Sequence, residues 1–243
     1  MLLKFNRTAA ALLGTMLAAQ AHAGTIDLIT NGSFERATVN GGQLGVTTIV
    51  TGWTSTGYNF LFPAGAADTT GVVGQYGSLS IWGPGNGAAN GLSASSPDGG
   101  NFVAADGAYG VAPIEQTIHN LVVGDAYTLS FLWAGAQQSG YSGATTEQWQ
   151  VSLGSETHST AVVDNANHGF TGWVSEAMTF TATATTETVS FLAVGTPAGQ
   201  PPFSLLDGVS MQGEVSVPEP GSMALLGTAI AALARWRRTR RTA

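Results

Sequence analysis

A strict alternation of apolar and polar residues in three stretches constrains the fold of this chain more than any other feature. The three stretches are residues 125–133, 147–153 and 188–194. In the first of them, every second side chain from Tyr127 to Trp133 is large and apolar, while Thr128 and Ser130 lie between. Because successive side chains of a strand point to opposite faces, we expect half-buried strands of an antiparallel sheet.

Further short segments have the composition of strands, with many threonine, β-branched and aromatic residues. They are residues 26–30, 48–54, 78–82, 102–105, 114–118, 158–163, 174–181 and 204–211. Turn-forming clusters separate them, for example at residues 40–42, 120–124 and 196–199. Many short strands joined by glycine-rich turns predict an all-β domain built as an antiparallel two-sheet sandwich.

One glycine-rich segment, residues 83–100, is too long for a plain connection between strands. It contains six glycines in eighteen residues. A loop of this length is either a binding loop or a mobile one. Its Gly-x-Gly pieces lack the lysine and the strand–turn–helix context of a phosphate-binding loop, so we reject that interpretation.

The N-terminus has the three parts of a secretory signal peptide. Lys4 and Arg7 precede an uncharged apolar stretch, residues 8–19, and Ala21-His-Ala23 is a small-x-small cleavage signature. We therefore expect a signal peptide at residues 1–23, handled by Sec-type export machinery and signal peptidase. The mature chain would begin at Gly24, and the sandwich domain would occupy residues 24–214.

The C-terminal tail, residues 215–243, also has three parts in a fixed order. A Pro-Glu-Pro turn at 218–220 comes first. Fifteen residues without charge, 220–234, begin at the last proline of this turn, and an arginine cluster at 235–241 ends the tail. As a helix these fifteen residues would reach about 22 Å, which is short for a permanent span of a hydrocarbon core about 30 Å thick. We expect a hydrophobic helix that anchors the precursor transiently. The arginines that would hold its end in the cytoplasm are Arg235, Arg237, Arg238, Arg240 and Arg241.

This tail resembles the PEP-CTERM sorting signal of Gram-negative bacteria. The resemblance rests on the motif Val217, Pro218, Glu219 and Pro220, on the hydrophobic segment and on the arginine cluster. It implies recognition and cleavage by an exosortase, a membrane-embedded enzyme. It also implies export across the inner membrane, a cell-surface or extracellular location after processing, and an association with exopolysaccharide.

Charge within the domain limits its partners. Residues 24–213 contain thirteen acidic residues and a single basic one, Arg36, so their formal charge is −12. Such a surface repels phosphate backbones, which argues against nucleic-acid binding. It favours neutral partners and divalent cations.

A second, looser resemblance covers nearly the whole domain. The motifs that carry it are residues 28–35, 97–106, 115–131 and 204–210. Together they resemble galactose-binding-like jelly rolls, a group that includes many carbohydrate-binding modules. The resemblance implies a jelly-roll sandwich and a structural Ca²⁺ held by Glu35 and Asp207, since Ca²⁺ prefers oxygen ligands. Alternatively, Glu35 is a solvated turn residue and Asp207 a turn former.

Sugar binding would require exposed aromatic side chains, and three residues are the best candidates. Trp82 opens the glycine-rich segment, while Tyr109 and Tyr141 lie in glycine-rich loops. The other tryptophans of the domain fall on apolar strand faces or after glycine, and we expect most of them in the core.

Catalytic signatures are not evident in the sequence. Neither a His-Glu-x-x-His metal motif nor a Gly-x-Ser-x-Gly nucleophile turn occurs. Our leading hypothesis is an exported, exosortase-processed surface or matrix protein with a non-catalytic sandwich that binds polysaccharide. One alternative is a purely structural or adhesive protein without a ligand pocket. Another is a secreted carbohydrate-active hydrolase, which would need two carboxylates converging in a cleft.

Overall fold

The structure is a computed structural model that describes residues 26–213. Several predictions therefore concern parts of the chain outside the described residues. These parts are the signal peptide 1–23, the sorting motif Val217, Pro218, Glu219 and Pro220, the hydrophobic helix, and the arginines Arg235, Arg237, Arg238, Arg240 and Arg241.

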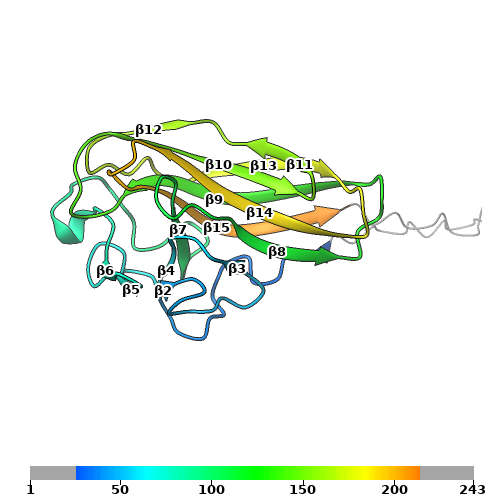
Figure 1. Ribbon diagram of the computed structural model, residues 1–243, viewed down its shortest axis with the longest axis horizontal. Coiled ribbons are helices and arrows are strands. Elements are labelled where there is room, and N and C mark those ends of the chain that lie inside the picture. The colour runs from blue at the N-terminus through cyan, green and yellow to red at the C-terminus, as the bar shows by residue number, and fades with distance from the viewer. Residues whose placement is uncertain (1–25, 214–243) are drawn as a thin grey trace, which may run out of the picture. The chain divides into compact units, whose positions relative to one another are not determined.

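Two antiparallel sheets make up most of the described domain (Figure 1). The seven-stranded sheet contains β1 (Ile26–Asp27), β2 (Gly42–Gln43), β4 (Asn59–Phe62), β7 (Phe102–Asp106), β9 (Ala126–Gln137), β13 (Val174–Thr181) and β15 (Pro202–Gly213). The six-stranded sheet contains β3 (Thr54–Ser55), β8 (Ile114–His119), β10 (Thr145–Leu153), β11 (Glu156–Ser159), β12 (Val163–Asn165) and β14 (Thr186–Thr196). A separate hairpin joins β5 (Val72–Gly74) and β6 (Gly77–Leu79). The predicted all-β, two-sheet jelly-roll sandwich is confirmed.

Helix is nearly absent from the described residues. They contain one 3₁₀ turn, η1 (Pro84–Asn86), within the glycine-rich segment. No helix in residues 26–213 has the length and apolar character needed to cross a membrane.

The main core lies between the two sheets and is built by the predicted alternation. On β9, Leu129, Phe131 and Trp133 are buried, and they face Trp149 and other apolar side chains of the opposite sheet. Burying each large apolar side chain stabilises the fold by ~1.5–3 kcal/mol. The indole N–H of Trp149 donates to the carbonyl of Leu205 at 3.1 Å and so links β10 of one sheet to β15 of the other.

A second core lies on the other face of the seven-stranded sheet. Leu61 of β4 belongs to the main core, whereas its neighbours Phe60 and Phe62 belong to the second core. Residues 63–101, which we call the covering segment, contribute Val72, Leu79, Ile81 and Leu92 to it. In Figure 1 the hairpin β5–β6 lies below the long strands, with β2 and β4, and the short turn η1 lies beyond their left end. This additional layer is not part of the predicted two-layer architecture.

Strand β4 was missing from the sequence-based expectations because both of its faces are covered. All four of its residues are buried, so Asn59–Phe62 shows no alternation. A short apolar run of this kind does not reveal its structure by periodicity.

Some predicted strands are wrong or too long. The strand expected at 48–54 is not continuous: Thr48 and Val50 form only isolated bridges, Gly52 adopts φ +85°, and β3 begins only at Thr54. The expected strand at 26–30 is reduced to Ile26–Asp27, and that at 78–82 is shifted to Gly77–Leu79.

The strand expected at 158–163 is divided into β11 and β12. Both pair with β10, at different points along its length. Between them, the Thr160 hydroxyl accepts the Trp149 N–H at 3.0 Å, which replaces one ladder bond.

Candidate ligand-binding pocket

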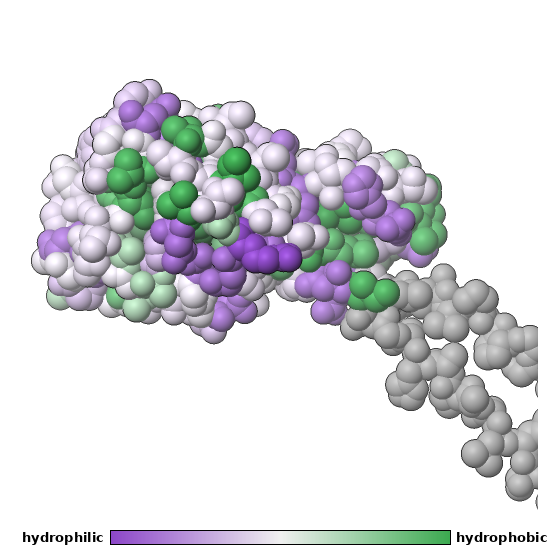
Figure 2. Space-filling model, turned by 90° about the horizontal axis from the view of Figure 1, so that it is seen from below, coloured by the Kyte–Doolittle hydropathy of each residue, from purple (hydrophilic) through white to green (hydrophobic). Residues whose placement is uncertain are grey.

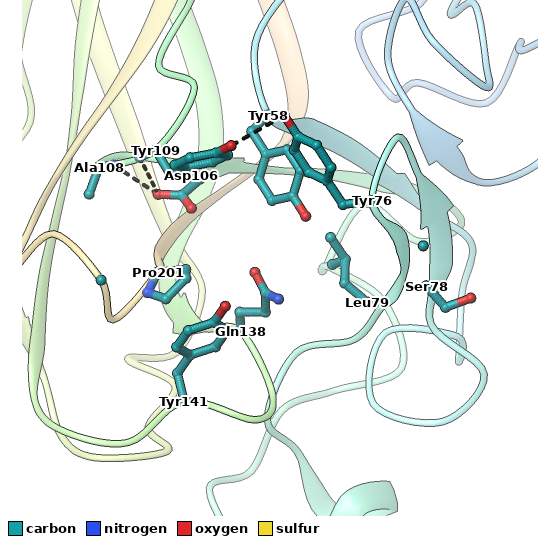
Figure 3. A pocket seen from close by; sticks show the side chains of 12 residues that line it. Tyr58, Tyr76, Ser78, Leu79, Asp106, Ala108, Tyr109, Gln138, Tyr141 and Pro201 are labelled. Atoms are coloured by element: carbon teal, nitrogen blue, oxygen red, sulfur yellow. Dashed lines mark hydrogen bonds between the residues drawn. The ribbon is translucent and has the colours of Figure 1, made fainter.

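Four of the chain's five tyrosines line one pocket of about 380 Å³ (Figure 3). These are Tyr58, Tyr76, Tyr109 and Tyr141, and we call the site the tyrosine pocket. It lies where β7 and β9 end and β15 begins, because Asp106 pairs with Phe203 and Gln137 pairs with Pro202. The turn of the β5–β6 hairpin adds Tyr76 and so closes one side.

Three of the tyrosine rings form a connected group. The rings of Tyr58 and Tyr109 are perpendicular, at 89°, with centroids 5.4 Å apart. Tyr76 lies 6.0 Å from Tyr58 and 6.2 Å from Tyr109, and the Tyr109 hydroxyl donates to the Tyr76 hydroxyl at 3.2 Å. Tyr58 also packs edge-on against Phe60 at 4.5 Å, which fixes the group to the second core.

Asp106, the last residue of β7, provides the charge of the pocket. Its Oδ1 accepts the backbone N–H groups of Ala108 at 2.8 Å and Tyr109 at 3.0 Å. Its Oδ2 is buried and has no hydrogen-bond partner among the described residues. Burial raises the pKa of Asp106 to about 6, although the two backbone donors act to lower it. The carboxylate is therefore ionised at neutral pH in a pocket that is lined by four phenol rings.

The opposite side of the pocket is formed by Gln138 and Tyr141. Figure 3 shows both side chains across the open space from Asp106 and Tyr58. The ring of Tyr141 is 41% exposed, and its backbone carbonyl accepts the indole N–H of Trp82 at 2.8 Å. Trp82 packs against His168 with ring centroids 4.0 Å apart and ring planes inclined at 31°. Trp82 thus holds the Tyr141 loop without lining the pocket.

A buried side chain, Gln43, ties two walls of the pocket together. Its Oε1 accepts the N–H of Gln75 at 2.9 Å, and its Nε2 donates to the carbonyl of Gly57 at 3.2 Å. These two backbone groups directly precede Tyr76 and Tyr58. The hairpin tip and the approach to β4 are therefore fixed relative to each other.

Gly107 allows the loop after Asp106 to approach β14 closely. A Cβ at this position would lie 2.5 Å from the backbone nitrogen of Gly195. The backbone of Gly107 bonds to Pro202 at 2.9 Å and to Gly195 at 3.0 Å. A larger residue would displace the segment that carries Asp106 and Tyr109.

The remaining described surface is less distinctive. A more open hollow of about 480 Å³ near β3 and β8 is lined mainly by threonine, valine and isoleucine with Glu115 and Gln116. Its one aromatic residue, Trp53, is buried and belongs to the main core. Figure 2 shows hydrophobic patches that are separated by hydrophilic ones on the face seen from below. Scattered apolar residues are normal on a folded domain, so the tyrosine pocket is the better candidate site.

The two predicted calcium ligands lie in one neighbourhood. Asp207 is fully buried, its Oδ2 accepts the Ser96 hydroxyl, and its Oδ1 has no partner among the described residues. Burial, with a smaller contribution from the nearby carboxylates of Asp98 and Glu35, raises the pKa of Asp207 to about 7. Glu35 Oε1 accepts the Asn101 N–H at 2.6 Å.

This neighbourhood fits a hard cation in part. A buried carboxylate oxygen without a donor, close to other carboxylates, is the kind of group that Ca²⁺ neutralises. Within residues 26–213, however, no three His, Cys, Asp or Glu side chains converge as metal ligands. Backbone carbonyls or water would have to complete the coordination, so Ca²⁺ at Glu35 and Asp207 stays a prediction.

The structure brings together two of the three aromatic residues predicted as ligand contacts, Tyr109 and Tyr141. The third, Trp82, lies beside the pocket. Sequence reasoning missed Tyr58, Tyr76 and Asp106. Tyr76, between Gln75 and Gly77, had the same signal as Tyr109, an aromatic residue in a glycine-rich turn. Asp106 directly follows the predicted strand at 102–105 and carried no signal that it was buried.

Comparison with known families identifies the tail. Residues 216–241 match the PEP-CTERM protein-sorting motif. The chain carries a PEP-CTERM sorting signal. This motif implies export, sorting to the cell surface and processing by an exosortase. No curated protein matches the chain.

Solved structures similar to this chain include carbohydrate-binding-module domains. The CBM22-1 xylan-binding domain of Paenibacillus barcinonensis Xyn10C is 12% identical with a TM-score of 0.38, over 81% of this chain and 100% of that domain. A CBM4 structure is 16% identical with a TM-score of 0.33, over 76% of this chain and 99% of that one. The enzymatically active domain of bacteriophage CBA120 tailspike protein 4 is 16% identical with a TM-score of 0.36. That match covers 77% of this chain and 21% of the tailspike chain.

Proposed function

We propose that this chain is an exported, exosortase-processed cell-surface or extracellular-matrix protein whose non-catalytic β-sandwich binds polysaccharide in the tyrosine pocket. The observation that carries this proposal is the convergence of Tyr58, Tyr76, Tyr109 and Tyr141 around Asp106 and Gln138. The pyranose ring of a sugar has an apolar face and a rim of hydroxyl groups. Aromatic rings match the face, and carboxylate and amide groups match the hydroxyls.

The size of the pocket agrees with a small portion of a polysaccharide. Its volume of about 380 Å³ is near the lower end of ligand pockets, which range over roughly 300–1,000 Å³. A pocket with walls on several sides suits the end of a glycan chain or a short branch better than a long continuous strand.

The composition of the pocket supports binding in preference to hydrolysis. Glycoside hydrolysis ordinarily needs two carboxyl groups on either side of the scissile bond, about 5–9.5 Å apart. Asp106 is the one acidic side chain among the residues that line the tyrosine pocket. A hydrolase would need a second carboxylate there.

The route to the surface follows from the two ends of the chain. In this proposal, Sec-type machinery exports the precursor and signal peptidase removes residues 1–23. Residues 220–234 then anchor the precursor transiently in the inner membrane, with the arginines at 235–241 in the cytoplasm. Exosortase cleavage near residues 217–220 frees the domain. Intact mass of the mature protein, from cells with and without the exosortase, tests this route; an unprocessed C-terminus in both strains would contradict it.

Binding is tested on a glycan array that includes the exopolysaccharide of the host, using the full-length chain. We expect binding by the wild type and by the control variant Val123→Ala. Val123 is an exposed apolar residue in the β8–β9 connection, at the end of β9 opposite the tyrosine pocket. We expect loss of binding in Tyr141→Ala. If no glycan binds, the structural or adhesive alternative is favoured and the proposal fails.

A further inference from the structure

We propose that the tyrosine pocket selects an organic ammonium group, and that the polysaccharide unit it binds is an amino sugar with a free amine. This inference rests on the proposed function of the pocket and names the class of sugar. It follows from three observations: a buried carboxylate oxygen without a partner among the described residues, aromatic rings on several sides of the pocket, and the scarcity of positively charged side chains in the domain.

The first observation is the state of the Asp106 carboxylate. One of its oxygens already accepts two backbone N–H groups, while Oδ2 is buried without a partner among the described residues. A buried acceptor without a donor is unfavourable, and an unpaired buried charge is more so. A neutral hydroxyl would satisfy the acceptor alone. An ammonium group would satisfy the acceptor and also neutralise the charge, since the pKa of about 6 leaves Asp106 ionised at pH 7.

The second observation is the arrangement of the rings. A cation within about 6 Å of a tyrosine ring centroid is attracted by the electron-rich face, by about 0.5–2 kcal/mol. Tyr58, Tyr76 and Tyr109 have centroids only 5.4–6.2 Å apart, so one small cation can lie within this range of more than one ring. Tyr141 lies on the opposite side of the open space (Figure 3).

The third observation is the charge around the pocket. Lysine, arginine and histidine are missing from the residues that line it. Arg36 is the one basic residue in residues 24–213, against thirteen acidic residues. Uronates and sulfated sugars would therefore be repelled, whereas a cationic ligand is attracted by the whole domain and held by Asp106.

Calorimetric titration of the full-length chain at pH 7 distinguishes these ligand classes. The probes are β-1,4-linked oligosaccharides of equal length, made of glucosamine, of N-acetylglucosamine or of glucose, together with choline as an ammonium ion without a sugar. We expect the glucosamine oligomer to bind at least about tenfold more tightly than the two neutral oligomers, which corresponds to about 1.4 kcal/mol.

Two variants separate a specific contact from the general attraction of a cation to an acidic domain. Asp106→Asn keeps the shape and the Oδ1 acceptor, and we expect it to remove the preference for glucosamine. Asp125→Asn also removes one negative charge, but just before β9, at the end of that strand opposite the pocket. We expect the preference for glucosamine to persist in this variant. Tyr141→Leu, at an exposed ring, is a further variant that should also weaken the preference; thermal melting checks that each variant is folded.

Each outcome has a distinct meaning. If the neutral oligomers bind as tightly as the glucosamine oligomer, the ammonium inference is overturned and the sugar site stands. If only choline binds, and Asp106→Asn abolishes it, ammonium recognition is supported but the sugar source is refuted. If no probe binds, the ammonium inference fails, and the proposed function is then decided by the binding of the host exopolysaccharide.

Discussion

The indole N–H of Trp82 donates to the backbone carbonyl of Tyr141 at 2.8 Å, and this bond joins the start of the glycine-rich segment to a wall of the tyrosine pocket. Trp82 packs against His168, so the bond comes from a ring that is itself held in place. Trp82 was expected to contact a ligand. It instead supports Tyr141, which lines the pocket.

Trp82→Phe should therefore weaken ligand binding without unfolding the domain. The variant keeps an aromatic ring for His168 and loses the hydrogen bond, whose net contribution is about 0.5–1.5 kcal/mol, so we expect roughly 2- to 13-fold weaker binding. Trp173→Phe is the matched control, since the indole N–H of Trp173 is buried without a partner among the described residues. Titration should show the loss in Trp82→Phe alone; equal losses in both variants would refute a positioning role for Trp82.

Asp106→Asn should stabilise the domain at pH 7 while it abolishes cation binding. Burial raises the pKa of Asp106 from 3.8 to about 6. Between these two pH values the folded state keeps a proton on Asp106 that the unfolded state has lost. The stability that protonated Asp106 supports is fully present below about pH 4 and is lost as pH rises through 6. We expect the midpoint of Asp106→Asn to exceed that of the wild type at pH 7 and to approach it at pH 4. A variant less stable than the wild type at pH 7 would contradict this.

Glu147 should make the stability of the domain fall as the pH rises from about 4.5 to about 8. Its side chain is fully buried, its Oε2 has no partner among the described residues, and burial raises its pKa from 4.5 to about 8. The contribution of protonated Glu147 to the free energy of unfolding is therefore fully present below about pH 4.5. It is lost as the pH rises through 8, by up to about 1.4 kcal/mol per pH unit.

Glu147→Gln imitates the protonated side chain and should remove this dependence. Melting between pH 5 and 8 should show a flatter curve for the variant than for the wild type. The Thr145 hydroxyl can still donate to the amide oxygen of the introduced glutamine, as it does to Oε1 of Glu147. Parallel curves would show that Glu147 has an ordinary pKa in the folded protein.

Calcium removal should lower the melting midpoint if Glu35 and Asp207 hold the ion. At a calcium concentration about 100-fold above the dissociation constant, binding stabilises a protein by about 2.7 kcal/mol. For a domain of this size the loss corresponds to roughly 5–10 °C. Chelator should have this effect on the wild type and on Asp125→Asn, and none on Glu35→Gln. An unchanged wild-type midpoint would remove Glu35 and Asp207 as calcium ligands.

The fold was largely predictable because several of its longer strands are covered mainly on one face. The strands β10, β13 and β14 alternate between buried and more exposed positions, so their sequence carries the period of a strand. This signal fails where a second layer covers the sheet. Phe60 and Phe62 face the covering segment while Leu61 faces the main core, so the three residues 60–62 are all apolar and show no alternation.

The candidate site was less predictable, since it depends on contacts between distant segments. Tyr109 and Tyr141 could be identified as exposed aromatics in glycine-rich loops. Their convergence with Tyr58 and Tyr76 depends on the path of the covering segment and on the bonds of Gln43, which no local pattern encodes. The same is true of Asp106, whose burial comes from its position at the end of β7.

The most direct test of the central claim is a titration of the host's own exopolysaccharide into the full-length chain and into a Tyr109→Ala, Tyr141→Ala double variant, with Val123→Ala as the control. If the tyrosine pocket binds polysaccharide, the wild type and the control will bind alike, and the double variant will bind at least about tenfold more weakly, a loss of about 1.4 kcal/mol. Equal binding by all three proteins, or binding by none, would contradict the claim.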